Sequence, residues 1–570
     1  MRYITRQLVL ILFIIFIFIF ASYFKLTTEN VFSVGNKDFT KMELANNLKR
    51  ALSASEELLK ENIELRNIIS EFIDSKAKGF VKDNEENKVK KEIIDENILN
   101  SSNNNHYTAN HEALLKEAIR NTREMYFFVK ASLSSINDKA LQNDATDRLL
   151  SLNVDIKRLY KDGSLWRSRE LKKLSNFIQE RIYTLQNPEN CDKSKFVLCN
   201  LDKGCGFGCQ LHHVAFCFYM ALGTNRTLLF DKDGDEWRYS KKGWKSVFQP
   251  ISKCSYEKNA KNKPTATWSG VRGTRSDDVV IRIPIIDYIS PKPNFVPLTL
   301  PEELSSKMIE LHSFPTAYFT GQILKYAMRH NDEFEKKFSK FVEEVPFEKS
   351  PIVGIHVRRT DKIGTEASFH DVKEYMNHAE IFFREKEIEM ETQISRKVFI
   401  ATDDSTVIDD LRKKYPNYTF YGDENVANNA GVGKRYEDDS LHGIIKDIRF
   451  LSKCSFIIGT FSSQVSRMAY ELMQVESQDD AGYNYASIDD VYYFGGQQAH
   501  NLRAIKSHKA LTKEEISFEK DSLIGIAGNH WNGWSKGALV GGNHETGLFP
   551  SYKVVEDWKT AEMSIFKGFV

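Results

Sequence analysis

Residues 351–370 read PIVGIHVRRTDKIGTEASFH, a short apolar run that ends in a cluster of charges. The apolar part, PIVGIHV, has the length and composition of a buried strand. It ends around His356, and the charged residues that follow are Arg358, Arg359, Asp361, Lys362 and Glu366. Ligands bind beyond the carboxyl ends of strands in open α/β sheets, and arginines grip phosphate oxygens through planar, bidentate hydrogen bonds. The stretch therefore predicts an anion-binding strand end, with a purely structural Arg–Asp ion pair as the alternative.

Two further apolar runs end in polar residues suited to the same edge of a sheet. KVFIATD (397–403) leads into Asp404, and CSFIIGT (454–460) leads into a small polar loop that ends at Gln464. A loop that opens the N-terminus of a helix binds anions readily, because the helix dipole and the free N–H groups favour negative charge. Ordinary helix capping by Ser462 or Ser463 is the alternative interpretation.

Short apolar runs alternate with helical stretches through much of the chain, which is typical of parallel sheets in an α/β body. The other runs are KFVLCNL (195–201), RTLLF (226–230) and VVIRIPII (279–286). We expect this body over residues 188–508, with a Rossmann-type part at about 350–490. Beyond it, DSLIGIAGN, WNGWSKG and TGLFPSYKV look like short strands between glycine-rich turns, so residues 509–570 predict a small β-barrel.

Composition excludes several classes of protein. The chain has 570 residues, of which 41% are hydrophobic and 28% are charged, so most of it should fold around buried cores. This balance excludes a wholly disordered chain and a multi-span membrane protein. Lys plus Arg is 79 against 78 for Asp plus Glu, a net charge of +1, so we expect no nucleic-acid partner.

The N-terminus carries a candidate membrane anchor. Residues 7–24 contain no charge, and their length suffices for one span. Arg2 and Arg6 precede this run and Lys25 follows it, which predicts a cytoplasmic tail at residues 1–6 and a luminal remainder. A cleaved signal peptide is the alternative, but the run exceeds the roughly 7–15 apolar residues usual there. A short, phenylalanine-rich span fits a thin early-secretory membrane.

A stalk is expected over residues 25–110. Within it, residues 41–73 carry a heptad pattern whose apolar seam is broken by Ser55 and Asn62. A buried Asn at an a position fixes register in dimeric coiled coils, so we expect a homodimer, with a solvated single helix as the alternative. The Lys-, Glu- and Asn-rich stretch after residue 75 is typical of a linker. Helical spacing of apolar residues then predicts a helical region over residues 111–187.

The cysteines favour an oxidising compartment. Six of the seven lie close together, at Cys191, Cys199, Cys205, Cys209, Cys217 and Cys254. Such a cluster predicts disulfides, although the sequence leaves their pairing open. Zinc binding by Cys205 and Cys209 with nearby histidines is disfavoured, because the spacing matches no zinc pattern well. Cys454 has no local mate and is expected to be a buried free thiol.

Two turn motifs invite a ligand-binding interpretation. GCGFGC at residues 204–209 resembles a glycine-rich phosphate loop, but its cysteines favour a disulfide-pinned turn. DKDGDE at residues 231–236 resembles a metal loop, but its glycine is misplaced for a calcium loop, so we expect a solvated turn. We therefore expect no metal site.

Several motifs, in chain order, resemble those of the α-1,6-fucosyltransferases that core-fucosylate N-glycans. They are GCGFGCQLHHVAFCF, VGIHVRRTDKIGTEASFH, ATDD, SLHGIIKDIRFLS, TFSSQV, YYFGGQQAHN and GNHWNGWSKG with GLFPSYKV. The resemblance runs from about residue 110 to the C-terminus. It implies a GT-B-like catalytic body, a C-terminal SH3-like barrel and a Golgi type II membrane protein. It also implies a GDP-fucose donor, an N-glycan acceptor, inversion of configuration, and no cofactor or metal ion.

The resemblance also implies roles for individual residues. The donor-binding residues would be His356, Arg358, Arg359, Asp404, Asp447, Ser463 and Gln464, with Asp447 contacting guanine. The catalytic residues would be Glu366 as general base, Lys362 beside it, and Arg358 on the β-phosphate, with His356 helping to stabilise the charge. The acceptor-binding residues would be Glu366, Lys362, Asp490 and, on the barrel, His530 and Lys536. The aromatic residues Trp531, Trp534, Phe549 and Tyr552 could otherwise form a peptide groove.

One departure from the family pattern concerns the TFSSQV loop. The family usually has a disulfide flanking this loop, whereas the matching positions here are Gly459 and Ser466. The loop lacks a staple but keeps its donor-site residues. An inactive luminal homologue that binds glycans or scaffolds partners is the main alternative, and a peptide-binding adaptor and a metal-dependent transferase are others.

Overall fold

The computed structural model describes residues 108–270, 280–359, 368–431, 434, 436–495, 500–542 and 546–569. The predicted anchor and stalk, and the predicted site residues Lys362 and Glu366, lie outside these residues. The chain divides into units at Met1–Glu64 and Leu65–Val570, and everything described belongs to the second. Among the described helices, none combines the length and the apolar character needed to cross a membrane.

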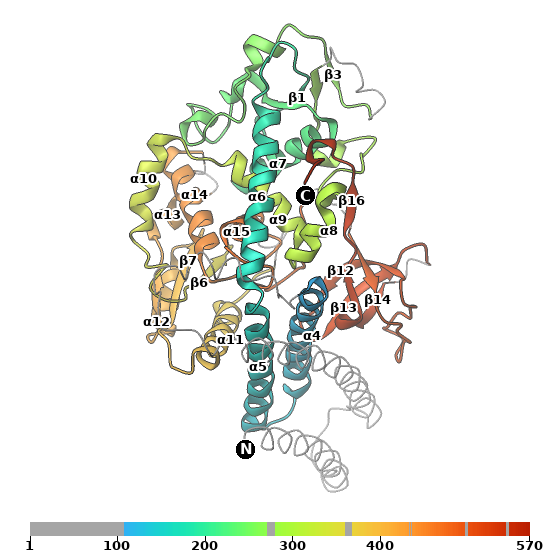
Figure 1. The fold of residues 1–570 in the computed structure, drawn as a ribbon. Coiled ribbons are helices and arrows are strands. Elements are labelled where there is room, and N and C mark those ends of the chain that lie inside the picture. Colours follow the sequence, from blue (N-terminus) through green and yellow to red (C-terminus); the bar gives the residue numbers. More distant parts are fainter. Residues whose placement is uncertain are drawn as a thin grey trace, which may run out of the picture. The chain divides into compact units, whose positions relative to one another are not determined.

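Three long helices precede the sheets, as the apolar spacing predicted. They are α4 (Ala109–Leu133), α5 (Lys139–Lys161) and α6 (Ser164–Gln186), and Figure 1 shows α4 and α5 side by side. Thr108 caps α4 by accepting a hydrogen bond from the His111 amide. Arg167 on α6 is fully buried between Glu112 of α4, at 3.0 Å, and Asp479 of the body. This charge cluster fastens the helices to the body, because leaving any member unpaired there would be costly.

Two parallel sheets form the α/β body (Figure 1). The first has the order β2-β1-β4-β3, and its strands are β1 (Phe196–Cys199), β2 (Thr227–Phe230), β3 (Thr265–Thr267) and β4 (Val280–Arg282). The second has the order β10-β9-β6-β7-β8, and its strands are β6 (Val353–Val357), β7 (Lys397–Thr402), β8 (Thr419–Tyr421), β9 (Phe456–Gly459) and β10 (Tyr485–Ser487). Each apolar run singled out in the sequence contains one of these strands. Strand β3 escaped prediction because its residues are exposed and polar.

The remaining helices pack around and between these sheets. They are α7 (Phe207–Thr224), α8 (Glu302–Leu311), α9 (Pro315–Ala327), α10 (Asp332–Val342), α11 (Val372–Met390), α12 (Thr406–Lys414), α13 (Glu424–Asn429), α14 (Asp438–Lys453) and α15 (Gln464–Glu476). Helix α7 is buried along nearly its whole length, and most of its residues are apolar, as a helix in the core requires. Gly321 of α9 lies directly against the Glu471 carbonyl of α15, where a side chain would collide with it. This close contact packs α9 directly against α15, within the core cluster that includes residues around both sheets.

All six clustered cysteines form disulfides, as predicted. The pairs are Cys191–Cys254, Cys199–Cys217 and Cys205–Cys209. Cys454 is a buried free thiol, also as predicted. The sequence left these pairings open because the spacing of cysteines along the chain does not determine which of them lie close together in the fold.

The C-terminal part is rich in β-structure. An antiparallel sheet has the order β14-β13-β12-β11-β15, and its strands are β11 (Asn501–Ala504), β12 (Leu523–Asn529), β13 (Trp534–Leu539), β14 (Gly547–Pro550) and β15 (Val554–Glu556). This sheet begins at Asn501, ahead of the boundary at residue 509 drawn from composition. Strand β16 (Lys559–Ala561) leaves it and pairs in parallel with β5 (Thr299–Pro301) of the body. The tail thus ties the two parts together.

The four aromatic residues considered for a peptide groove do not share one surface. Phe549 lies in the core of the C-terminal sheet and is completely buried. Trp531 packs against Phe127 of α4, with their ring centres 5.9 Å apart. The groove interpretation is therefore wrong, because two of its members are occupied by internal packing.

Candidate active site

The C-terminal edge of the second sheet gathers most of the predicted donor residues. Because all five strands are parallel, their carboxyl ends meet at this edge. Arg358 and Arg359 follow β6, Asp403 and Asp404 follow β7, and the loop Thr460–Ser463 follows β9. The sequence predicted these strand ends separately, and only the strand order makes them neighbours.

Asp403 links the ends of two neighbouring strands. Its carboxylate forms an ion pair with the Arg358 guanidinium and accepts a 2.8 Å hydrogen bond from the Arg359 amide. Asp403 is buried, while the Arg358 side chain keeps 16% of its surface exposed. A guanidinium carries its five N–H donors in a planar fork, a geometry that suits carboxylates and phosphates. Asp403 thereby orients the cation at this edge.

Arg359 is held differently from its neighbour. It is buried, and its guanidinium carbon lies 3.8 Å from the ring centre of Phe369. Its Nη1 atom has no hydrogen-bond partner within the described part of the chain. The expected alternative, a structural pair with Asp361, involves a residue outside that part. A buried donor without a partner is available to a ligand that reaches it.

His356 is buried and faces α15 rather than open solvent. Its Nδ1 atom lies 2.7 Å from the hydroxyl of Ser466. Burial and the nearby Arg358 charge lower the pKa of His356 to about 3, so its ring is neutral at physiological pH. In this structure His356 pairs with the Ser466 hydroxyl, and its expected part in stabilising charge on the donor stays a prediction.

The loop after β9 presents an uncapped helix N-terminus. Ser463 occupies the cap position of α15, but its side chain makes no capping hydrogen bond, and no acidic residue lies in the first turn. The amides of Phe461 and Ser462 donate to the Asp489 carboxylate at 2.8 and 3.3 Å. The structure therefore favours the anion-site interpretation over capping by Ser462 or Ser463, because the first-turn amides of α15 keep their positive potential.

Several polar side-chain atoms around this loop are buried without partners among the described residues. They are Thr460 Oγ1, Ser462 Oγ and Gln464 Oε1. Buried polar atoms are nearly always hydrogen-bonded in native proteins, so each such exception calls for an explanation. A bound ligand with matching polar groups would provide one.

Asp447 lies on α14 and is 92% buried, with 8% of its surface exposed. Burial raises the pKa of its carboxyl well above the usual range, and Asp423 adds to this while Lys446 opposes it. No hydrogen bond to Asp447 is present among the described residues. A ligand that donates hydrogen bonds to this carboxyl group would offset the free-energy cost of burying it without partners.

Other predicted residues are engaged locally or lie apart. Asp404 accepts hydrogen bonds from the Thr406 amide and hydroxyl at 3.0 and 2.6 Å, at the start of α12. Asp490 accepts from the Val491 amide at 2.8 Å, and burial raises the pKa of its carboxyl. His530 and Lys536 are exposed on the C-terminal sheet.

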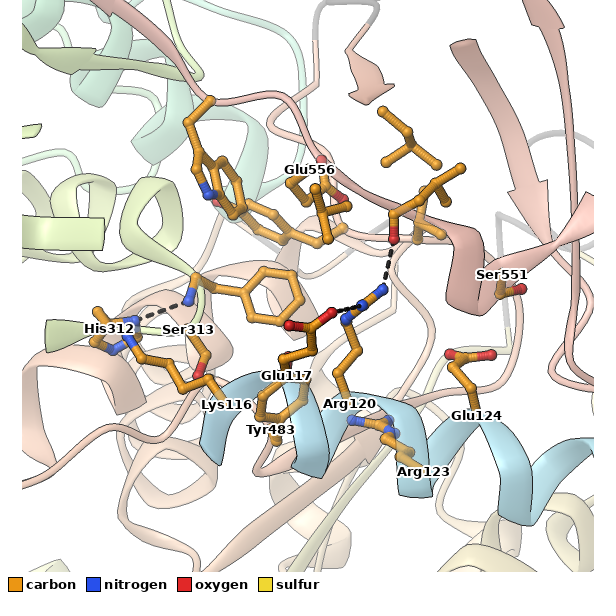
Figure 2. Close-up of a pocket in the computed structure, with 18 of the residues that line it drawn as sticks. Lys116, Glu117, Arg120, Arg123, Glu124, His312, Ser313, Tyr483, Ser551 and Glu556 are labelled. Atoms are coloured by element: carbon orange, nitrogen blue, oxygen red, sulfur yellow. Dashed lines mark hydrogen bonds and ion pairs between the residues drawn. The ribbon is translucent and has the colours of Figure 1, made fainter. Parts of the chain in front are cut away.

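A cavity of about 770 Å³ lies between α4 and the C-terminal sheet (Figure 2). Its walls come from α4, the end of α8, the C-terminal sheet and the β9 loop, and they include Asn529 and Trp531 on either side of His530. Burial and the adjacent Asp557 raise the pKa of Glu556 to about 8. Figure 2 shows Arg120 and Glu124 reaching from α4 toward the segment that carries Ser551 and Glu556, whereas Lys116 donates to the Ile309 and Glu310 carbonyls at the end of α8.

The acids of DKDGDE make contacts within the protein. Asp231 forms an ion pair with Arg282 at 2.7 Å, and Asp233 accepts hydrogen bonds from Ser255 Oγ and the Tyr256 amide at 2.7 and 2.6 Å. We expected this turn to be merely solvated. Instead, its two acids hold the neighbouring segments of the chain through an ion pair and hydrogen bonds. Within the described ranges, the only cluster with metal-ligand geometry is Cys199, His213 and Cys217, and there the cysteines are joined as a disulfide.

Comparisons with known proteins define the class of this chain. A family model described as the N- and catalytic domains of α-(1,6)-fucosyltransferase matches residues 1–493. An α-(1,6)-fucosyltransferase from Caenorhabditis elegans is 43% identical over 447 residues, which cover 77% of each chain. One from Drosophila melanogaster is 42% identical over 434 residues, covering 76% of this chain and 68% of the relative. The crystal structure of NodZ α-1,6-fucosyltransferase soaked with GDP-fucose aligns at 15% identity with a TM-score of 0.30, covering 49% of this chain and 93% of that one.

These matches define a glycosyltransferase. More particularly, the chain belongs to the α-(1,6)-fucosyltransferase family, whose named activity is fucose transfer in α-1,6 linkage. The resemblance noted from the motifs is thereby confirmed.

Proposed function

We propose that this chain transfers fucose from GDP-fucose to the 6-hydroxyl of the innermost GlcNAc of N-glycans on glycoproteins. The observation that carries this proposal is the C-terminal edge of the second sheet. There Asp403 orients the Arg358 guanidinium at the strand end, and the N-terminus of α15 carries no side-chain cap. A diphosphate leaving group accumulates negative charge as the sugar–phosphate bond breaks, and preorganised donors of this kind stabilise it.

The Asp447 carboxyl supports guanine as the base of the donor. Guanine offers two N–H donors on its Watson–Crick edge, which suit a carboxylate that lacks partners. Binding would remove the cost of leaving Asp447 buried and unpaired. We therefore expect GDP to bind more tightly than ADP or UDP.

We propose an inverting displacement with Glu366 as the general base. The acceptor oxygen would form a bond to C1 of fucose as the bond from C1 to the phosphate oxygen breaks, the hydroxyl proton would pass to Glu366, and GDP would leave. Glu366→Gln should leave GDP binding nearly intact while transfer falls by about 100-fold or more. Transfer at the parental rate would show that Glu366 is not the base.

The overall architecture and location are also proposals. We propose that the two parallel sheets form a GT-B-like body and that the C-terminal sheet is an SH3-like barrel. In this proposal Asp490, His530 and Lys536 contact the glycan. We also propose a Golgi type II protein anchored by residues 7–24 and dimeric through its helical, coiled-coil stalk. Protease protection in sealed vesicles and the mass of the detergent-solubilised chain would test these two points.

The deciding experiment is fucose transfer by the full-length chain from GDP-fucose to an agalacto biantennary N-glycan, with EDTA present. A deoxyhexose on the innermost GlcNAc would support the donor, the acceptor and metal independence together. GDP binding without product would favour the inactive glycan-binding homologue. Restoration of activity by added divalent cations would refute metal independence, and failure to bind GDP would refute the donor site.

A further inference from the structure

A buried hydrogen-bonded cluster joins the two halves of the body. The Nε2 atom of His212 on α7 lies 3.1 and 2.9 Å from the two carboxyl oxygens of Glu471 on α15. The hydroxyl of Tyr492 donates to Glu471 at 2.7 Å. Relative exposures of 4%, 0% and 7% for His212, Glu471 and Tyr492 shield these bonds from water. Hydrogen bonds shielded from water in this way are strengthened by the low local dielectric.

The partners of His212 determine where its protons lie. Nδ1 is 2.9 Å from the Gly208 carbonyl oxygen, which can only accept, so Nδ1 carries a hydrogen. Nε2 faces the Glu471 carboxyl, so the contact requires a proton either on the ring or on the carboxyl.

Both ends of this cluster touch the loop that opens α15. Gly208, whose carbonyl His212 holds, lies so close to Gln464 that a Cβ atom on Gly208 would come within 2.9 Å of the Gln464 Cβ. At the other end, the Tyr492 ring meets the Phe461 ring edge-on, with their centres 5.5 Å apart. The disulfide Cys205–Cys209 closes the turn that contains Gly208. The cluster thus contacts this loop at two points, Gln464 through Gly208 and Phe461 through Tyr492.

We propose that His212, Glu471 and Tyr492 are positioning residues that fix the N-terminus of α15 for the donor diphosphate. None of the three is assigned a contact with the donor, so they act through Gln464 and Phe461. The inference rests on the proposed donor site. Amides that are already ordered bind an anion without an additional entropy cost for ordering them. Loosening the cluster should therefore weaken donor binding more than it slows the chemical step.

The test uses the full-length chain and measures GDP affinity by calorimetry, KM for GDP-fucose, kcat and the melting temperature. His212→Phe and Glu471→Leu should weaken GDP binding about tenfold, and Tyr492→Phe about threefold, with kcat changed less than KM. Glu471→Gln should bind GDP within about twofold of the parent, because an amide can donate to His212 Nε2 and accept from Tyr492.

Tyr219→Phe is the matched control. Tyr219 also lies on α7, is completely buried, and pairs its hydroxyl with Thr320 at 3.0 Å. We expect this variant to lower the melting temperature and leave GDP affinity unchanged within about twofold, because its lost bond is neutral and does not reach the donor loop.

If Tyr492→Phe lowers the melting temperature as Tyr219→Phe does and leaves GDP affinity unchanged, the cluster serves stability alone and the inference is overturned. The same holds if Glu471→Gln is as impaired as Glu471→Leu. Should His212→Phe or Glu471→Leu fail to fold, Tyr492→Phe and Glu471→Gln decide the matter. A parental chain that binds no GDP would instead refute the proposed function, and the inference with it.

Discussion

The two parallel sheets end in C-terminal edges of opposite character. At the first sheet, Cys199 at the end of β1 is bonded to Cys217, and Arg282 at the end of β4 is paired with Asp231. At the second sheet, Ser462 and Gln464 keep buried polar atoms without partners in the described structure. At the positions compared, the first edge is closed by a disulfide and an ion pair, whereas the second keeps buried polar atoms without described partners. Binding capacity follows from the unsatisfied groups rather than from the fold alone.

The largest expected effect comes from replacing one arginine at each edge by alanine, which tests whether the two edges differ in function. Arg358 and Arg282 both pair with an aspartate at a strand end. Arg358→Ala should lower kcat/KM by about 1000-fold or more, because it removes charge stabilisation from the leaving group. Arg282→Ala should stay within about twofold, because a partly exposed ion pair contributes little. Equal losses in steady-state kinetics would show that the edges do not differ in function.

A second prediction concerns Asp447. Asp447→Asn should weaken GDP binding by about 10- to 100-fold, since one hydrogen-bond acceptor becomes a donor facing guanine. Asp231→Asn at the first sheet serves as the control and should leave GDP affinity unchanged. Calorimetric titration with GDP measures both. Unchanged affinity in Asp447→Asn would assign base recognition elsewhere.

The same substitution tests a dependence of stability on pH. A carboxyl whose pKa is raised by folding stabilises the fold at low pH, and that contribution is lost as the pH rises toward the folded pKa. Without ligand, Asp447→Asn should therefore melt higher than the parent at pH 7 and about the same near pH 4. A lower melting temperature at pH 7 would contradict the raised pKa.

The smallest expected effect on GDP binding comes from adding a disulfide across the loop that follows β9. A Cβ atom at Gly459 would lie 3.4 Å from the Ser466 Cβ, about the separation that a disulfide needs. The double variant Gly459→Cys/Ser466→Cys should form that bond and gain about 2–3 kcal/mol, while GDP affinity changes by less than about threefold. Thiol titration and melting measure this. Ser466→Ala separates the loss of the hydrogen bond to His356, and persistent free thiols would contradict the predicted geometry.

Much of the fold could be predicted because burial leaves a strong local pattern. PIVGIHV and KVFIATD identified β6 and β7 through continuous apolar runs, which strands buried on both faces require. Strands β3 and β11 gave no such signal because they are short and carry polar or exposed residues. Two of the three positioning residues, Glu471 and Tyr492, gave no signal either, because a glutamate in an ordinary helix and a tyrosine in a loop look like surface residues until their burial is known.

The sequence by itself determined the parallel α/β body, the disulfide-forming cysteines and the family, because these depend on local composition and motif order. Only the tertiary structure decided what each polar residue does. His356 became a neutral partner of Ser466, and the helix after β9 was left uncapped. The physical reason is that a side chain's charge and availability depend on its burial and its neighbours, which strands distant in sequence bring together.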